Sequence, residues 1–337
     1  MGLVKVIGVG HYCPDNIVSN DELALIVDTS HEWIFKRTGI KERRISNGEG
    51  TVDLAIKAAK MALNMANCKE TDIDLIIVST TSPDRIMPST ACSVQNILGC
   101  TNAVAFDVSA ACSGFIYASI IANSLLKNGE GKKALVIGSE GFGVSKIVKQ
   151  NCDFVVRMGK KMMIIGVETL SKILDWSDRS TCVLFGDGAG AAVLEISDEK
   201  QGILSTYFGS DGERGHKALI ANEFTLNNPF SKNELSKKEF IEMDGKEVFR
   251  FAVSIIPEVV NKLLEKSGED LSNIKYIIPH QANSRIIDEA AKRLKIEKEK
   301  FYLNLENYGN TSAASIPIAL SEAIEEKAIN KGDKVIL

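Results

Sequence analysis

The chain has 337 residues, of which 45% are apolar and 25% are charged, and its formal net charge is −4. This length suggests roughly two domain-sized units with a large core, and the negative charge argues against general nucleic-acid binding. No apolar run is long enough to cross a membrane, and the N-terminus lacks the layout of a signal peptide. Seven scattered cysteines without a CxxC pair are typical of the reducing cytosol. No His/Cys group has zinc spacing, so we expect no metal.

The first half of the chain predicts helices and strands in a regular alternation. Apolar residues recur at helical spacing in three segments, and each is followed by a short apolar run typical of a buried strand. The predicted helix–strand pairs are 53–66 with 72–78, 89–98 with 103–108, and 112–127 with 131–137. This alternation predicts an α/β fold whose sheets are covered by helices.

The second half repeats the same order of elements. Its predicted pairs are 248–267 with 272–278, 284–294 with 301–310, and a helix from Ser312 with 332–337. The two series match step by step, so the turns at Cys112 and Asn310 occupy equivalent places. The sequence therefore predicts two pseudo-duplicated halves, residues 1–196 and 197–337.

Three residues that can carry chemistry stand next to predicted strands. Cys112 begins a predicted helix, where the helix dipole favours the thiolate that attacks carbonyl carbon. His280 and Asn310 each follow a predicted strand, and α/β folds place chemistry at the C-terminal ends of strands. Taken singly, each also fits a structural role, as a buried thiol, a strand-end histidine and a turn asparagine.

Five motifs together resemble one known family, the β-ketoacyl-acyl-carrier-protein synthases III of the thiolase-like superfamily. They are WIFKRTGI from Trp33, DVSAACSGF around Cys112, FGDGAGA from Phe185, PHQAN around His280 and GNTSAAS around Asn310. The motifs occur in the family's order and cover most of the chain. The resemblance implies the five-layered αβαβα thiolase-like fold, with the active site between the two halves.

The resemblance also implies a decarboxylating Claisen condensation. Cys112 would take the acyl group from acyl-CoA, with acetyl-CoA as the first candidate, and malonyl-acyl-carrier-protein would then lose carbon dioxide. The resulting enolate would attack the acyl-cysteine and release 3-oxoacyl-acyl-carrier-protein. His280 and Asn310 would donate hydrogen bonds to the enolate oxygen, and an asparagine at 310 favours the initiating class. No cofactor is implied, since the CoA thioester is a substrate.

Further residues take binding roles by the same resemblance. The implied CoA-binding set is Trp33, Arg37, Arg179, Phe249, Ala282 and Asn283, with Trp33 and Arg179 on either side of the adenine. A basic helix face of Arg285, Lys292 and Arg293 would bind the acidic acyl carrier protein. Met87 would close the acyl pocket of the partner subunit in a homodimer. Plainer interpretations are a core tryptophan in an amphipathic helix and a solvated helix face.

Two segments depart from the family pattern. GKKALVIGSE (131–140) recurs as GKKMMIIGVE (159–168), which suggests an insertion by tandem duplication near 138–166 and leaves open which copy occupies the sheet. Residues 181–195 read as two strands around a glycine turn, and the second half has no counterpart because it stops at Leu337. We therefore expect the second half to lack its last strands and one backbone oxyanion donor.

The leading hypothesis is thus a cytoplasmic, homodimeric enzyme that initiates type II fatty-acid synthesis. A related condensing enzyme or acyltransferase of secondary metabolism, or a non-catalytic remnant of the fold, are the alternatives. The sequence does not determine the length or branching of the primer.

Overall fold

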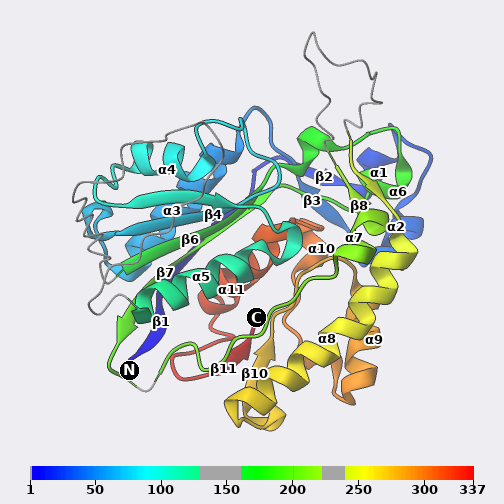
Figure 1. Ribbon diagram of the computed structural model, residues 1–337. Coiled ribbons are helices and arrows are strands. Elements are labelled where there is room, and N and C mark those ends of the chain that lie inside the picture. Colours follow the sequence, from blue (N-terminus) through cyan, green and yellow to red (C-terminus); the bar gives the residue numbers. More distant parts are fainter. Residues whose placement is uncertain (1, 129–160, 200, 222–239) are drawn as a thin grey trace.

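The structure consists of alternating layers of helices and sheets (Figure 1). It is a computed structural model that describes residues 2–128, 161–199, 201–221 and 240–337. The predicted strand 131–137 and the first part of the predicted insertion lie outside the described residues. Within the described part, no helix is both long and apolar enough to cross a membrane.

The larger sheet has five strands in the order β1-β7-β6-β4-β5. Their bounds are Leu3–Tyr12 for β1, Gly188–Ser197 for β7, Lys161–Glu168 for β6, Leu75–Ser79 for β4 and Val104–Val108 for β5. β4 runs parallel to β5 and β6, whereas β7 runs antiparallel to β6 and β1. All five residues of β4 are buried, as expected for a strand covered on both faces.

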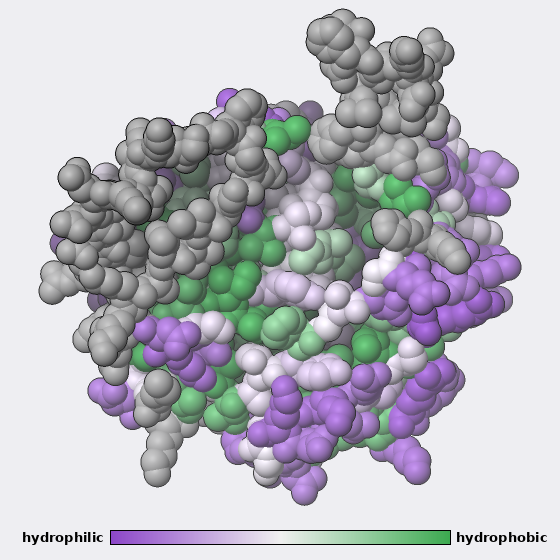
Figure 2. Space-filling view, in the orientation of Figure 1, coloured by the Kyte–Doolittle hydropathy of each residue, from purple (hydrophilic) through white to green (hydrophobic). Residues whose placement is uncertain are grey.

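Helices cover both faces of this sheet. The outer helices are α3 (Thr51–Ala66) and α4 (Thr90–Leu98), and the inner ones are α5 (Gly114–Asn128) and α11 (Ser315–Glu325). Side chains from α5, α11 and both sheets share one apolar cluster, so these two helices form the central layer. Figure 2 shows that the surface over α5 is largely apolar, while the surface around α8 and β10 is hydrophilic.

The second sheet pairs β10 (Ile274–Ile277) with β11 (Lys334–Ile336) in parallel. Its far face packs against α8 (Gly245–Ser267) and α9 (Ser284–Leu294) through a separate apolar cluster. The order of layers is therefore helix, sheet, helix, sheet, helix. The fold class predicted from the sequence is confirmed.

Shorter elements connect these layers. The short strands are β2 (Ile17–Ser19), β3 (Glu42–Arg44), β8 (Leu219–Ile220) and β9 (Glu242–Met243). The short helices are α1 (Asn20–Leu23), α2 (His31–Thr38), α6 (Arg179–Cys182), α7 (Gly212–Ala218) and α10 (Leu305–Tyr308). Single 3₁₀ turns are η1 (Glu70–Asp72), η3 (Leu170–Ile173), η4 (Leu271–Asn273) and η5 (Lys298–Lys300).

The second copy of the repeated segment occupies a strand of the larger sheet. Lys161–Glu168 forms β6, which lies between β7 and β4 in the middle of the larger sheet. The first copy, 131–140, lies outside the described residues.

Two strand predictions are wrong. Residues 301–310 contain two isolated bridge residues, Phe301 and Asn310, with the helical turn α10 between them. The Gln281 side chain accepts hydrogen bonds from the N–H groups of Asn304 and Leu305, so a side chain takes the place of a neighbouring strand. In 181–195, the Asp178 side chain caps the helical turn α6, which leaves β7 as the one full strand of that segment.

Candidate active site

Cys112 lies in a sharp turn between β5 and α5. The turn is the 3₁₀ segment η2 (Ala111–Ser113), so the predicted helix starts at Gly114 instead of Cys112. Ala111 has a φ of 44°, a left-handed conformation that costs a non-glycine residue about 1–3 kcal/mol. Gly114 is required sterically, because a Cβ there would lie 1.7 Å from the Ser79 hydroxyl oxygen.

An equivalent turn precedes α11 and faces the first. It is the 3₁₀ segment η6 (Ser312–Ala314), and Ser312 has a φ of 47°. The Ser312 hydroxyl donates to the Cys112 sulfur across 3.7 Å. The matching local geometry at η2 and η6 agrees with the repeat seen in the sequence, and it joins residues 200 positions apart.

His280 follows β10 and faces the thiol. Its Nδ1 atom lies 2.7 Å from the Ser315 hydroxyl oxygen, which leaves Nε2 for Cys112. Burial raises the pKa of the Cys112 thiol, but the imidazole of His280 and the Ser312 hydroxyl outweigh it, so the net direction is downward. Burial likewise lowers the pKa of His280, and the facing thiolate reverses this and raises it. Each charged group therefore shifts the pKa of the other toward its charged form.

Asn310 lies at the start of the second turn and is 7% exposed. Its Oδ1 atom accepts a hydrogen bond of 2.9 Å from the Ser312 N–H. Its backbone exchanges hydrogen bonds with Leu184 and Gly186. Since Oδ1 is occupied, the amide NH₂ is the group free to donate to a ligand.

The predicted CoA-binding residues lie on several elements. Trp33 on α2 is half-buried and packs against an apolar cluster that includes Leu23 and Cys182. The guanidinium groups of Arg37 and Arg179 stand over its ring, 4.3 and 4.7 Å from the centroid. Thus the core interpretation and the stacking interpretation both describe Trp33, and an adenine entering between Trp33 and Arg179 would displace a contact already present.

The other predicted binding residues are more scattered. Phe249 is half-buried on α8, and Ala282 precedes α9. Asn283 caps α9 by accepting from the Arg285 N–H at 2.9 Å, which gives it a structural role independent of CoA. Met87 is 83% exposed in the loop between β4 and α4.

The basic residues of α9 separate into two places. Arg285, in the first turn, lines a hollow of about 360 Å³ with Lys36 and Arg37 of α2. Lys292 and Arg293 are exposed in the last turn, where Arg293 pairs with Glu289 at 3.2 Å. Arg285 is thus brought to the predicted CoA site, about two helical turns from the other two.

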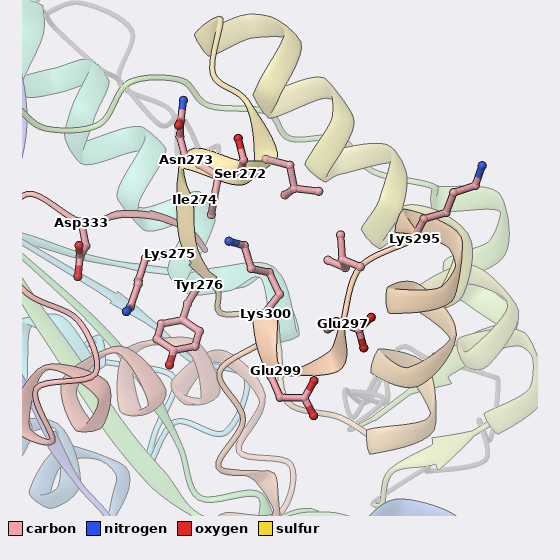
Figure 3. Close-up of a pocket in the computed structure, with 12 residues that line it drawn as sticks. Ser272, Asn273, Ile274, Lys275, Tyr276, Lys295, Glu297, Glu299, Lys300 and Asp333 are labelled. Carbon is pink, nitrogen blue, oxygen red and sulfur yellow. The ribbon is translucent and has the colours of Figure 1, made fainter.

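A larger surface hollow lies elsewhere. Figure 3 shows this space of about 800 Å³, bounded by the beginning of β10, by η5 and by charged side chains such as Lys275 and Glu299. Its lining includes neither Cys112 nor His280, which follows the opposite end of β10. The hollow is therefore separate from the candidate active site.

Sequence reasoning missed two groups beside the site. Ser315, the last residue of the GNTSAAS motif, received no predicted role, yet it contacts His280 directly. Glu168 ends β6 with its carboxylate fully buried, and it accepts hydrogen bonds from the Thr81 N–H and from the hydroxyls of Thr80 and Ser82. A charged residue at the end of an apolar strand was the available signal for Glu168.

A cysteine that faces a histidine and the turn holding an asparagine, within alternating layers of helices and sheets, matches the arrangement of thiolase-like condensing enzymes. Family profiles match two parts of the chain: "3-Oxoacyl-[acyl-carrier-protein (ACP)] synthase III" at residues 106–153 and 150–212, and its C-terminal counterpart at residues 264–337. The chain is 52% identical to "Beta-ketoacyl-[acyl-carrier-protein] synthase III" of Clostridium botulinum (strain Langeland), over 100% of this chain and 94% of that protein. It belongs to the β-ketoacyl-acyl-carrier-protein synthase III family.

Solved structures agree with this assignment. 3-Oxoacyl-[acyl-carrier-protein] synthase III from Aquifex aeolicus is 44% identical, with a TM-score of 0.83 over 98% of this chain and 94% of that one. The priming β-ketosynthase from the R1128 polyketide biosynthetic pathway is 31% identical, with a TM-score of 0.84 over 99% and 91%.

Proposed function

We propose that this chain catalyses the initiating condensation of type II fatty-acid synthesis. Acyl-CoA, with acetyl-CoA as the first candidate, and malonyl-acyl-carrier-protein would give 3-oxoacyl-acyl-carrier-protein, CoA and carbon dioxide. The observation that carries the proposal is the Cys112 thiol facing His280, beside the turn that holds Asn310. The names and identities of the relatives support the same reaction.

The first half-reaction is acyl transfer to Cys112. The thiolate attacks the thioester carbonyl of acyl-CoA, and the CoA thiolate leaves as the bond to sulfur breaks. The proton held by the His280 imidazolium leaves with the CoA thiol. Because each charge of the buried pair shifts the pKa of the other group toward its charged form, the pair is suited to supply both the nucleophile and the proton.

The second half-reaction needs donors instead of a base. Loss of carbon dioxide from the malonyl group leaves two electrons on the thioester enolate, and negative charge grows on its oxygen. The Asn310 NH₂ and the Nε2–H of neutral His280 are suited to hold that oxygen, and such a donor is typically worth 10²–10³ in rate, roughly 3–4 kcal/mol. The enolate carbon then attacks the acyl-cysteine, and the bond from the acyl carbon to sulfur breaks, which restores the Cys112 thiolate. A proton from solvent returns His280 to the imidazolium form.

Substrate binding would use the basic side chains at the mouth of the site. Trp33 and Arg179 would hold the CoA adenine, with Phe249, Ala282 and Asn283 as further contacts. Arg37, together with Lys36 and Arg285 around the smaller hollow, offers positive charge to CoA phosphates or to the acidic carrier protein. Lys292 and Arg293 would extend the carrier-protein surface along α9.

We further propose that the chain acts as a homodimer in the cytoplasm. β5 is an edge strand of the described sheet, and the nearby loop presents Ile86 and Met87 with 69% and 83% exposure. An edge strand and exposed apolar side chains are features that a second copy can cover. The six described cysteines are free thiols, which suits a reducing compartment. The two halves, 1–196 and 197–337, would each supply one side of the site.

The secondary-metabolism alternative has one specific support, the 31% identity to a priming polyketide ketosynthase. Release of carbon dioxide that depends on malonyl-acyl-carrier-protein would separate the two. Intact mass after incubation with a series of acyl-CoAs tests the proposal as a whole. A wild-type chain that gains no acyl group on Cys112 would be a non-catalytic member of the fold.

A further inference from the structure

The Ser315 hydroxyl lies between the imidazole of His280 and the Ser312 carbonyl, which itself also contacts the imidazole. Its oxygen lies 2.7 Å from His280 Nδ1 and 2.8 Å from the Ser312 carbonyl oxygen, and the residue is 2% exposed. A hydroxyl has one hydrogen to donate and two lone pairs. Ser315 can therefore donate to the imidazole or to the carbonyl, but not to both at once.

In the free enzyme the charges decide which bond forms. His280 as an imidazolium carries hydrogens on both nitrogens, so Nδ1–H donates to the Ser315 oxygen. The Ser315 hydrogen then goes to the Ser312 carbonyl. This arrangement agrees with the raised pKa of His280 opposite the Cys112 thiolate, although burial by itself acts to lower that pKa.

Acylation of Cys112 changes which protonation state of His280 the reaction needs. Cys112 becomes a neutral thioester, one proton leaves with the CoA thiol, and His280 keeps a single ring hydrogen. Only the tautomer with that hydrogen on Nε2 can donate to the enolate oxygen. Which nitrogen is protonated depends on the hydrogen bond made by the other one.

We propose that Ser315 is the positioning residue that sets this tautomer: in the acyl-enzyme its hydroxyl turns from the Ser312 carbonyl to donate to Nδ1 of His280. The carbonyl still receives the backbone N–H of Ser315 after the turn, so no buried acceptor is left unpaired. The inference rests on the proposed condensing function, and it assigns to Ser315 a role that a methyl group cannot fill.

Ser315→Ala gives a directional expectation. Without the hydroxyl, the Ser312 carbonyl is the remaining polar partner beside Nδ1, and a carbonyl accepts only from Nδ1–H. Neutral His280 then carries its hydrogen on Nδ1 and turns a lone pair toward the enolate. We expect condensation to fall about 10²-fold, while Cys112 acylation and alkylation change only a few-fold, because the imidazolium form keeps Nδ1–H bonded to the carbonyl.

The test is nitrogen NMR of acetylated enzyme with labelled histidine, with His280 assigned by its loss in His280→Gln. The wild-type acetyl-enzyme should show the Nε2–H tautomer, Ser315→Ala the Nδ1–H tautomer, and Ser315→Thr should restore the first. Ser321→Ala is a matched control, because Ser321 is a fully buried serine of the same helix that contacts His11 Nδ1 at 3.0 Å.

Two results would overturn the assignment: a wild-type acetyl-enzyme in the Nδ1–H form, which needs no variant to observe, or an unchanged tautomer and condensation rate in Ser315→Ala. Intact mass of the same samples distinguishes a failure of the role assigned to Ser315 from a failure of the proposed condensing function. If the wild type takes up no acetyl group at all, the condensing function itself is wrong, and the role of Ser315 falls with it.

Discussion

Replacing His280 with alanine should slow the alkylation of Cys112, because it removes the charge that opposes burial. Two unit charges about 4 Å apart attract by about 4 kcal/mol at an effective dielectric constant near 20. At about 1.4 kcal/mol for each factor of ten, this corresponds to roughly a thousandfold in the thiolate population. The thiolate that remains is more basic and more nucleophilic, with a Brønsted slope of about 0.4–0.5, which restores nearly half of the loss on a logarithmic scale. We therefore expect a rate about 30–50-fold lower at neutral pH.

The pH dependence of Cys112 alkylation should differ between wild type and His280→Ala in a defined direction. The pKa of Cys112 in the wild type is lowered, since His280 outweighs burial, so its alkylation rate should reach a plateau at a lower pH than that of a free thiol. In His280→Ala burial acts unopposed, and the rate should still be rising in the alkaline range.

The assay is iodoacetamide labelling followed by peptide mapping of each cysteine. His11→Ala is the control, because His11 contacts Ser321 on the far side of α11 and should leave the labelling rate unchanged. Equal alkylation rates and equal pH profiles for wild type and His280→Ala would refute the ion-pair account. Preferential labelling of another cysteine in the wild type would remove Cys112 as the nucleophile.

Three further outcomes are expected. Asn310→Ala should lower malonyl decarboxylation about 10²–10³-fold and leave Cys112 alkylation nearly unchanged; equal losses in both steps would contradict an enolate donor. Arg285→Glu should raise the KM for acyl carrier protein and weaken the salt dependence of that KM. Lys275→Glu, an exposed charge reversal at the start of β10, should change neither. Identical KM values for both variants would mean that Arg285 is only a solvated surface residue. Glu168→Ala should lower the free energy of unfolding by about 3 kcal/mol or more, because it leaves the Thr81 N–H and the three hydroxyls of Thr80, Thr81 and Ser82 without this acceptor. Glu195→Ala, at a partly exposed residue at the other end of the sheet, should cost about 1 kcal/mol or less. Urea titration compares the two variants.

The sequence predicted the elements that local signals define. α9 begins and ends where predicted, since Asn283 caps its start and its apolar residues recur at a clean helical spacing. The strand predicted at 301–310 failed, because the N–H groups of Asn304 and Leu305 donate to the side chain of Gln281, a residue about twenty positions earlier that no local pattern identifies. Only pairing partners could decide which copy of the repeated segment enters the sheet, since the two copies have nearly the same strand pattern.

The residues of the candidate site could likewise be predicted only where a local signal marks them. Cys112, His280 and Asn310 could be proposed because each stands next to a predicted element in a recognisable motif. The contact between His280 and Cys112 adds a second proposed role for His280, on the thiol as well as on the enolate. Ser315 could not be selected, because a serine after a turn has an ordinary structural explanation and its partner lies 35 residues away. Likewise, Arg285 joins Arg37 only through the packing of α2 beside α9.

The central claim is that Cys112 takes an acyl group and passes it to a malonyl-derived enolate. The most direct measurement is intact mass with peptide mapping of the chain after acetyl-CoA, and again after addition of malonyl-acyl-carrier-protein. We expect one acetyl group on Cys112, which disappears as 3-oxobutyryl-acyl-carrier-protein and carbon dioxide form, and no uptake by Cys112→Ala. An unmodified Cys112, or an acetyl group that persists in the presence of malonyl-acyl-carrier-protein, would contradict the account.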